Sequence, residues 1–285
     1  MKSLRMITVY MGFIMIMGNV SWAEEEANDT LAVKSRHIFS SDIDATASDI
    51  SMTETEFKYA HEFKAGGVLP IEYSFHFGHI DIEDDDPLDL PSHLESRSLG
   101  LGVKLPAPLL DQDKFFVGLD IFPTLNTDAW RWESSAFRLP FRSYLIYKES
   151  DDFILVGGVS VRPEYDTTVL PVLGVIYKPN DRLSFNLASE NPNITYKFND
   201  TTNLIWEFDY KLDEYEVRRS GQQGVVLEYR ETSAGFGVEH AFNENVSGLL
   251  TVGGVFNRRL EYKDDVGKVI PDSGFYVNAK FTASF

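Results

Sequence analysis

The sequence predicts an all-β protein, folded as a closed antiparallel transmembrane up-and-down β-barrel of about twelve strands. Apolar and polar residues alternate with a period of two in one segment after another, as they do on the two faces of a strand. Turn residues such as Gly, Pro, Asn and Asp separate these segments at short intervals, and no segment has the apolar period of a helix. The face opposite the apolar one mixes Gly, Ser and charges of both signs, which fits a polar lumen better than a sandwich core.

The final segment, residues 275–285, shows the alternation most clearly. Phe275, Val277, Ala279, Phe281 and Phe285 fall on one face, whereas the residues between them are mostly polar. A strand of this kind at the edge of a soluble sheet would invite aggregation. In a closed barrel with lipid outside and water inside, the same strand is the expected arrangement.

The first residues have the pattern of a secretory signal peptide. Lys2 and Arg5 precede the apolar run 6–17, and the small residues Ser21 and Ala23 mark a cleavage site after Ala23. We therefore assign residues 1–23 to a signal peptide, which predicts export. Residues 24–52 are acidic and rich in Ser, Thr and Asp, with weak periodicity, so we expect a flexible acidic periplasmic lead-in there.

The composition excludes several classes of function. The chain has no Cys, so it has neither a disulfide framework nor a thiolate metal site. The formal net charge of −18 would repel nucleic acid, and we expect no nucleic-acid partner. No P-loop, H-E-x-x-H or G-x-S-x-G motif is present, and the acidic loop 81–89 lacks the ligand order of a calcium loop. We expect neither a cofactor nor a metal.

The barrel itself is assigned to residues 53–285. Two segments, 57–77 and 183–198, each read as one strand or two, so the strand count stays open by about two. Across Asn191-Pro192-Asn193 the apolar face changes parity, which indicates a hairpin tip or a bend within one strand. A second change of parity near Thr232 indicates a β-bulge.

Charged residues alternate with the apolar ones along most predicted strands and should therefore face the lumen. They are Glu62, Lys64, Glu72, Lys104, Asp120, Arg138, Arg142, Arg162, Glu207, Asp209, Glu231 and Arg259. Both signs are present, so one interpretation is a narrow lumen filled by paired charges. The other is an open polar channel in which these charges set solute preference.

Ser74 and His76 are the one candidate pair of nucleophile and base. They share a strand face, but that face is the lumenal one by the alternation, and no third orienting group can be identified. Ordinary lumenal polar residues explain them better than a catalytic site does.

The exported part of the chain resembles bacterial outer-membrane β-barrels, whose C-terminal assembly signal is an amphipathic strand ending in Phe, here Phe285. The segment Gly253 to Tyr262, which reads Gly-Gly-Val-Phe-Asn-Arg-Arg-Leu-Glu-Tyr, comes before the final hairpin. With this segment, the chain most resembles mid-sized barrels of unknown function. The resemblance implies the outer membrane as location. It also implies outer-membrane lipids, lipopolysaccharide and the barrel-assembly machinery as partners, and leaves the oligomeric state open.

Four functions remain in consideration at this point. The first is a structural barrel or narrow passive pore with a charge-paired lumen, which is not an enzyme. The second is a small-solute channel of the porin kind. The third is a lipid-modifying outer-membrane enzyme that uses Ser74 and His76. The fourth is a soluble periplasmic β-sandwich.

Overall fold

The computed structural model describes residues 28–285 except 44–47, 66–68, 85–88, 131–133, 164, 189–191, 220–221 and 264–266. Most of the described chain is strand. The strands are β1 (Asn28–Asp42), β2 (Asp49–Ala65), β3 (Leu69–Asp84), β4 (His93–Pro106), β5 (Phe115–Ile121), β6 (Thr124–Thr127), β7 (Phe137–Arg138), β8 (Phe141–Ser150), β9 (Phe153–Val161), β10 (Val169–Asn180), β11 (Leu183–Asn186), β12 (Asn193–Lys197), β13 (Thr202–Arg219), β14 (Gln222–Asn243), β15 (Val246–Tyr262), β16 (Gly267–Val269) and β17 (Gly274–Ser284). A single 3-10 turn, η1 (Ser134–Ala136), is the one helical element among the described residues. None of the described helical residues forms a helix with the length and apolar character of a membrane span.

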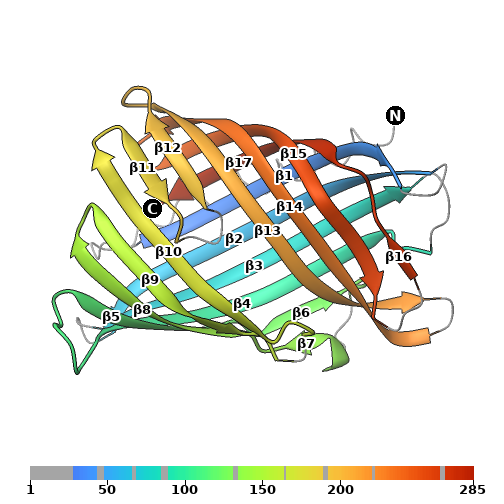
Figure 1. The fold of residues 1–285 in the computed structure, drawn as a ribbon, viewed down its shortest axis with the longest axis horizontal. Coiled ribbons are helices and arrows are strands. Elements are labelled where there is room, and N and C mark those ends of the chain that lie inside the picture. Colours follow the sequence, from blue (N-terminus) through green and yellow to red (C-terminus); the bar gives the residue numbers. More distant parts are fainter. Residues whose placement is uncertain are drawn as a thin grey trace.

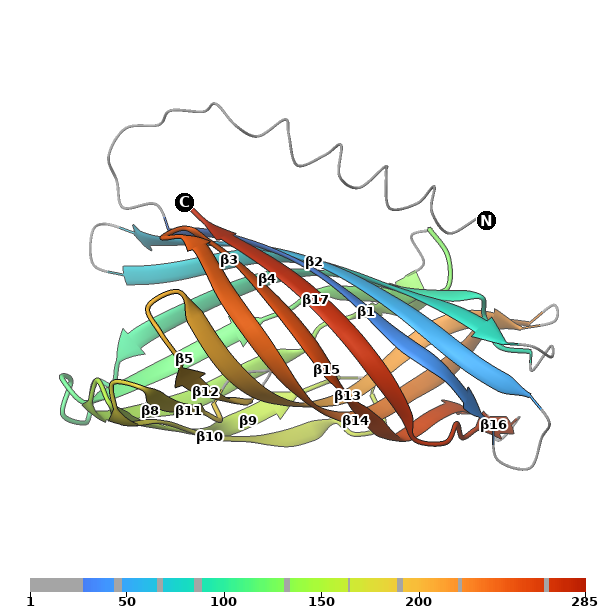
Figure 2. The same cartoon turned by 90° about the horizontal axis from the view of Figure 1, so that it is seen from above.

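The strands form one antiparallel sheet that closes on itself (Figure 1). Each strand pairs with its neighbours in chain order, and β1 pairs with both β2 and β17, which lie beside it in Figure 2. Three pairs of consecutive segments, β5 with β6, β7 with β8, and β16 with β17, each share one position in the wall. The described chain therefore forms a barrel of fourteen strands.

The all-β closed antiparallel barrel is thus confirmed, whereas the alternative of a two-sheet sandwich is wrong. The count of about twelve strands is too low. Part of the difference lies in 183–198, where β11 and β12 are two antiparallel strands with Asn186 opposite Asn193. Asn191 lies outside the described residues. The segment 57–77 is likewise two strands, β2 and β3.

The remaining strand is β1, in a region where the sequence led us to expect a flexible lead-in. Residues Thr30 to Ile38 pair with β17 on one side and with β2 on the other, and β2 itself begins at Asp49. The barrel starts at residue 28 of the described chain and not at 53. The expectation failed because the segment is polar in composition, which is typical of a flexible chain. In the barrel, charges of β1 pair with charges at the start of β2. The predicted signal peptide lies outside the described residues.

The change of parity near Thr232 does not mark a bulge in β14. The ladder between β13 and β14 runs without a shift from Thr202–His240 to Val217–Val225. Apolar residues change face because the environment changes along the strand: Phe236 and Val238 are exposed on the outer face, whereas Leu227 and Tyr229 are buried inside. A bulge does occur next door in β15, where the ladder shifts beside Asn257, which has a φ of 54°.

The two ends of the barrel differ. At one end, the termini end, residues 29 and 285 exchange backbone hydrogen bonds and the connections between strands include tight turns such as 151–152 and 244–245. The other end, the loop end, is filled by an apolar core. Its buried members are Ile38, Ile43, Ile50, Met52, Ile80, Ile82, Leu94, Tyr215, Val217, Val225, Leu227, Tyr229, Val255, Leu260, Tyr262, Val269 and Tyr276. A single parallel bridge from Thr127 of β6 to Glu216 of β13 brings opposite walls together there.

Deleting residues 28–42 should abolish the folded barrel, because β2 and β17 would each lose a complete ladder of backbone hydrogen bonds. The measurement is heat-modifiable migration on a semi-native gel after refolding in detergent. Wild-type chain should migrate as a compact band that shifts on boiling, and the deletion variant should show no such band. A flexible lead-in would instead predict normal folding of the deletion variant, so a heat-modifiable band from it would contradict the role of β1.

Candidate functional site: the barrel lumen

The lumen between the apolar core and the termini end is hollow. It contains a cavity of about 830 Å³ in the middle of the barrel and another of about 630 Å³ nearer the termini end. Both are lined by Lys58, Ser74, Phe122, Arg142 and Lys280, so they adjoin and form one lumenal space. The apolar core ends this space toward the loop end.

Most of the charges expected in the lumen do line these cavities. Glu62, Glu72, Lys104 and Asp120 line the smaller one, Arg162, Glu207 and Asp209 the larger one, and Arg142 both. Asp120 and Arg142, on paired strands β5 and β8, lie 3.6 Å apart. Tyr144, on the lumenal face of β8 next to Arg142, donates a hydrogen bond to Asp120.

Three other expected lumenal charges lie elsewhere. Lys64 is exposed near the end of β2, beside the connection to β3. Arg138 is buried in the short β7, where it donates to the carbonyl oxygens of Ser135 and Phe137. Arg259 pairs with Glu261 on the face of β15 opposite Leu260, which is buried in the core. The alternation failed for Arg259 because the bulge at Asn257 reverses the faces of β15 beyond it.

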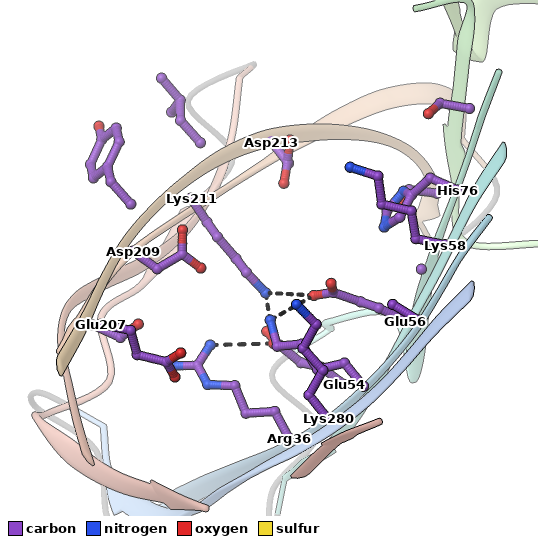
Figure 3. Close-up of a pocket in the computed structure, with 18 of the residues that line it drawn as sticks. Arg36, Glu54, Glu56, Lys58, His76, Glu207, Asp209, Lys211, Asp213 and Lys280 are labelled. Atoms are coloured by element: carbon purple, nitrogen blue, oxygen red, sulfur yellow. Dashed lines mark hydrogen bonds and ion pairs between the residues drawn. The ribbon is translucent and has the colours of Figure 1, made fainter. Parts of the chain in front are cut away.

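A cluster of buried charges lies where the lumen meets the apolar core, and the sequence analysis placed only Glu231 among its members in the lumen (Figure 3). Arg36 of β1 pairs with Glu54 of β2 and with Glu231 of β14. Lys211 of β13 reaches across the lumen to Glu54, at 2.6 Å, and to Glu56, at 3.6 Å. Lys34 also pairs with Glu56, at 3.1 Å. We call Lys34, Arg36, Glu54, Glu56, Lys211 and Glu231 the ion network.

The ion network joins opposite walls of the barrel. Arg36, Glu54 and Glu231 are each no more than 2% exposed. Each charge has therefore lost its contact with water, and its ion-pair partners must stabilise it instead. Arg36 also lies over the ring of Tyr276, 4.3 Å from its centroid. Tyr276 fits there because Gly235 faces it: a Cβ on Gly235 would lie 2.2 Å from the Tyr276 hydroxyl.

The sequence contained a signal for this network. Lys34 and Arg36, like Glu54 and Glu56, are spaced by two residues and therefore share a strand face. Opposite charges on the facing positions of two neighbouring segments are typical of a cross-strand pair. The assignment of 24–52 to a flexible segment kept Lys34 and Arg36 out of the predicted lumen, and Glu54 and Glu56 precede residue 57, where the first predicted strand began.

The candidate catalytic residues Ser74 and His76 both line the larger cavity, on the lumenal face of β3. Glu56 and Asp213 lie close enough to His76 to interact with it electrostatically. Lys58 lies beside His76 in Figure 3. The surroundings of His76 are thus a set of lumenal charges of both signs.

The final strand has the two faces that its sequence predicts. Tyr276, Asn278, Lys280 and Thr282 of β17 line the larger cavity, and the residues between them, from Phe275 to Phe281, point outward. Its proposed role as an assembly signal remains a prediction.

One group of carboxylates has the proximity of a metal site but is already partnered. Asp166, Glu214 and Glu228 place oxygen atoms within 4.8 Å of one another. The ammonium group of Lys263 lies 3.0 Å from Asp166 and 2.6 Å from Glu214. Lys263 thus balances these carboxylates, and they fix the loop after β9 against β13. In the same loop, burial raises the pKa of Tyr165 to about 12, so its hydroxyl stays neutral.

The fold and the lumen together define the class of protein: a closed antiparallel β-barrel with a polar lumen. Residues 120–284 match the family described as Domain of unknown function (DUF6268), and the chain belongs to that family. No curated protein matches the sequence.

Among solved structures, the COG4313 outer membrane channel from Pseudomonas putida F1 is similar at 12% identity, with a TM-score of 0.51 over 94% of this chain and 100% of that one. A FadL homologue of Pseudomonas aeruginosa has 10% identity and a TM-score of 0.46, over 92% and 91%. The KdgM porin has 11% identity and a TM-score of 0.36, over 89% and 99%. At these identities the first likeness shows a shared fold and nothing more.

Replacing Arg36 by Met should lower the free energy of unfolding by about 3 kcal/mol or more, because Glu54 and Glu231 would stay buried without their partner. Urea unfolding of the refolded barrel, followed by tryptophan fluorescence, measures this. Arg259→Met is the matched control, since it removes a partly exposed outer-face pair and should cost about 1 kcal/mol or less. Equal losses in the two variants would contradict a structural role for the ion network.

Proposed function

We propose that this protein is an integral barrel of the bacterial outer membrane, with a narrow polar lumen that the apolar core holds closed along the axis. The observation that carries the proposal is the contrast between its two faces. The lumen is lined by charges of both signs, whereas the outside carries a band of exposed apolar side chains. Leu99, Leu101, Leu250 and Val252 in this band are each more than half exposed. A soluble monomer rarely leaves so large an apolar surface in water.

Aromatic residues support a membrane location further. Near the termini end, neighbouring strands carry ring pairs on the outer wall: Phe63 with Tyr73, Phe115 with Tyr147, and Phe153 with Tyr177. Barrels of the outer membrane carry such a girdle at the lipid–water interface, and their short turns face the periplasm. The termini end would then be periplasmic and the loop end extracellular.

The lumen suits a restricted passage better than a wide pore. It opens toward the proposed periplasmic side, where Glu62, Glu72 and Lys104 line it, and it ends at the ion network and the apolar core. A packed apolar core excludes ions because they cannot shed their hydration there. In this conformation the path along the barrel axis is therefore closed. Ser74 and His76 lie on the lumenal wall, away from the proposed lipid face, which disfavours a lipid-modifying enzyme that would use this pair.

Expressed with its N-terminal segment in a Gram-negative host, the protein should be found in the outer-membrane fraction, because the apolar band needs hydrocarbon around it. The test is fractionation, followed by a semi-native gel of heated and unheated samples. Recovery of the processed chain in a periplasmic extract without detergent would contradict a membrane location.

In planar bilayers, wild-type protein should give few or no conductance steps, because the apolar core blocks the axis. Replacing Leu94 and Tyr215 by Ser should hydrate the core and produce discrete steps. The matched control replaces Leu99 and Trp206, which lie on the outer faces of the same two strands, and should stay silent. Large steady steps from the wild type would overturn the closed axis. Silence of the folded core variant would overturn the passage itself.

A further inference from the structure

The ion network is electrically neutral within itself. It contains three cations and three carboxylates, and each of these groups takes part in at least one ion pair. The network therefore has no net charge with which to balance its neighbours in the lumen. Lumenal charges outside it need partners of their own, because a charge that has lost part of its water is costly without one.

Two carboxylates of β13 line the larger cavity without a partner. Glu207 and Asp209 are two residues apart and therefore share the lumenal face of the strand. Within the part of the chain that the structure describes, neither accepts a hydrogen bond or forms an ion pair. Figure 3 shows both side chains on one wall of the cavity. Lys34 and Lys211 act electrostatically on Asp209, but both already pair with carboxylates of the ion network.

Lys280 of β17 is a cation without a partner in the same lumen. It lines both cavities, its side chain is exposed to them, and it forms no ion pair or hydrogen bond with the described residues. In the ladder between β1 and β17 it lies directly opposite Lys34, which is a like charge. Like charges at facing positions of two strands are destabilising. Glu56 balances Lys34 there, so an anion is missing beside Lys280.

An unpaired amide oxygen gives independent evidence for a missing group. Asn278 lies two residues before Lys280 on the lumenal face of β17, and it lines the larger cavity. Its side chain is buried, with 3% exposed, and its Oδ1 atom accepts no hydrogen bond. A buried acceptor without a donor costs free energy, so such an atom in a cavity wall indicates a donor that is not part of the chain.

The wall between these groups is thin. The ladders connect Glu207 to Tyr276 through Gly235 of β14 and Gly253 of β15. Tyr276 lies flat over both glycines, since a Cβ on either would collide with its ring or its hydroxyl. The lumen therefore stays open between the carboxylates of β13 and the polar face of β17. Its volume of about 830 Å³ is in the range of small-molecule sites, about 300–1,000 Å³.

We propose that the larger cavity binds a small water-soluble zwitterion, a molecule with an ammonium group at one end and a carboxylate at the other. The ammonium group lies at Glu207 and Asp209 and donates to Asn278. The carboxylate lies beside Lys280. The molecule enters from the termini end through the smaller cavity and does not have to pass the apolar core. The site rests on the polar lumen proposed above and names the class of solute for which that lumen is built.

The test uses three probes that share a six-carbon chain and differ only in the charges at its ends: 6-aminohexanoate, 1,6-diaminohexane and hexanedioate. Binding of radiolabelled 6-aminohexanoate to the full chain, purified in a nonionic detergent, is measured by equilibrium dialysis, and the other two probes compete with it. Wild-type protein should bind 6-aminohexanoate with an affinity about tenfold or more above that of either competitor. Each competitor places a like charge at one end of the site.

Two variants remove one end of the site each. Asp209→Asn and Lys280→Gln should each weaken binding of 6-aminohexanoate about tenfold or more, because each removes a charge-assisted contact. Lys280→Gln should also shift the preference toward the diamine, and Asp209→Asn toward the dicarboxylate. A loss of folding would lower all three affinities together, so this shift reports the site itself.

Glu239→Gln is the matched control. Glu239 lines the same cavity and the substitution changes the charge by the same amount, but its carboxylate already accepts hydrogen bonds from Asn203 and Ser247. This variant should keep the wild-type affinity. An equal loss in Glu239→Gln and Asp209→Asn would overturn the site. So would preferred binding of the diamine or the dicarboxylate by wild type, or no binding at all.

Fractionation and heat-modifiable migration of the same proteins separate this proposal from the membrane location. A folded barrel in the outer-membrane fraction that binds no 6-aminohexanoate refutes the zwitterion site alone. A chain that binds the probe in detergent but is absent from that fraction refutes the membrane location and supports the site.

Discussion

The architecture depends on one constraint: every backbone amide and carbonyl in the wall needs a partner. An open sheet leaves two edges, and a membrane offers no water to satisfy them. Here β1 and β17 meet over nine residue pairs and close the sheet. Closure then separates an outside from an inside, and the period of two along each strand gives the two sides different chemistry. The lumen and the apolar band are both consequences of that separation.

The alternation of apolar and polar residues places the apolar side chains outside in one part of the barrel and inside in the other. Toward the termini end, the apolar face of a strand points outward and the polar face lines the cavities. Toward the loop end, the strands β13 and β14 turn apolar residues inward and pack them into a core, while outer-face residues such as Glu214 and Glu216 are covered by the loop after β9 and by η1. The barrel thus combines a lined lumen with a globular interior. Among the described residues, this combination fills the loop end of the barrel with side chains of the wall itself.

The ion network sits at the boundary between these two regions. Buried charge pairs add little net stability compared with apolar packing, but they impose a unique geometry because each charge must find its partner. Arg36, Glu54 and Lys211 come from β1, β2 and β13, which stand on opposite sides of the lumen. Their pairing fixes how far the walls are apart at that level.

The sequence alone determined the class of fold, because alternation and turn residues are local properties that do not depend on distant partners. It also determined the faces of the final strand and the lumenal position of charges such as Glu72, Asp120 and Glu207. Only the tertiary structure showed that residues 28–42 are a strand. The charged composition of this segment is typical of a disordered chain, and Glu54, Glu56 and Glu231 pair with its charges only in the folded barrel. The tertiary structure also decided the meaning of the parity change near Thr232 and the reversed face of Arg259. Both depend on the register between neighbouring strands, which no single segment of the sequence records.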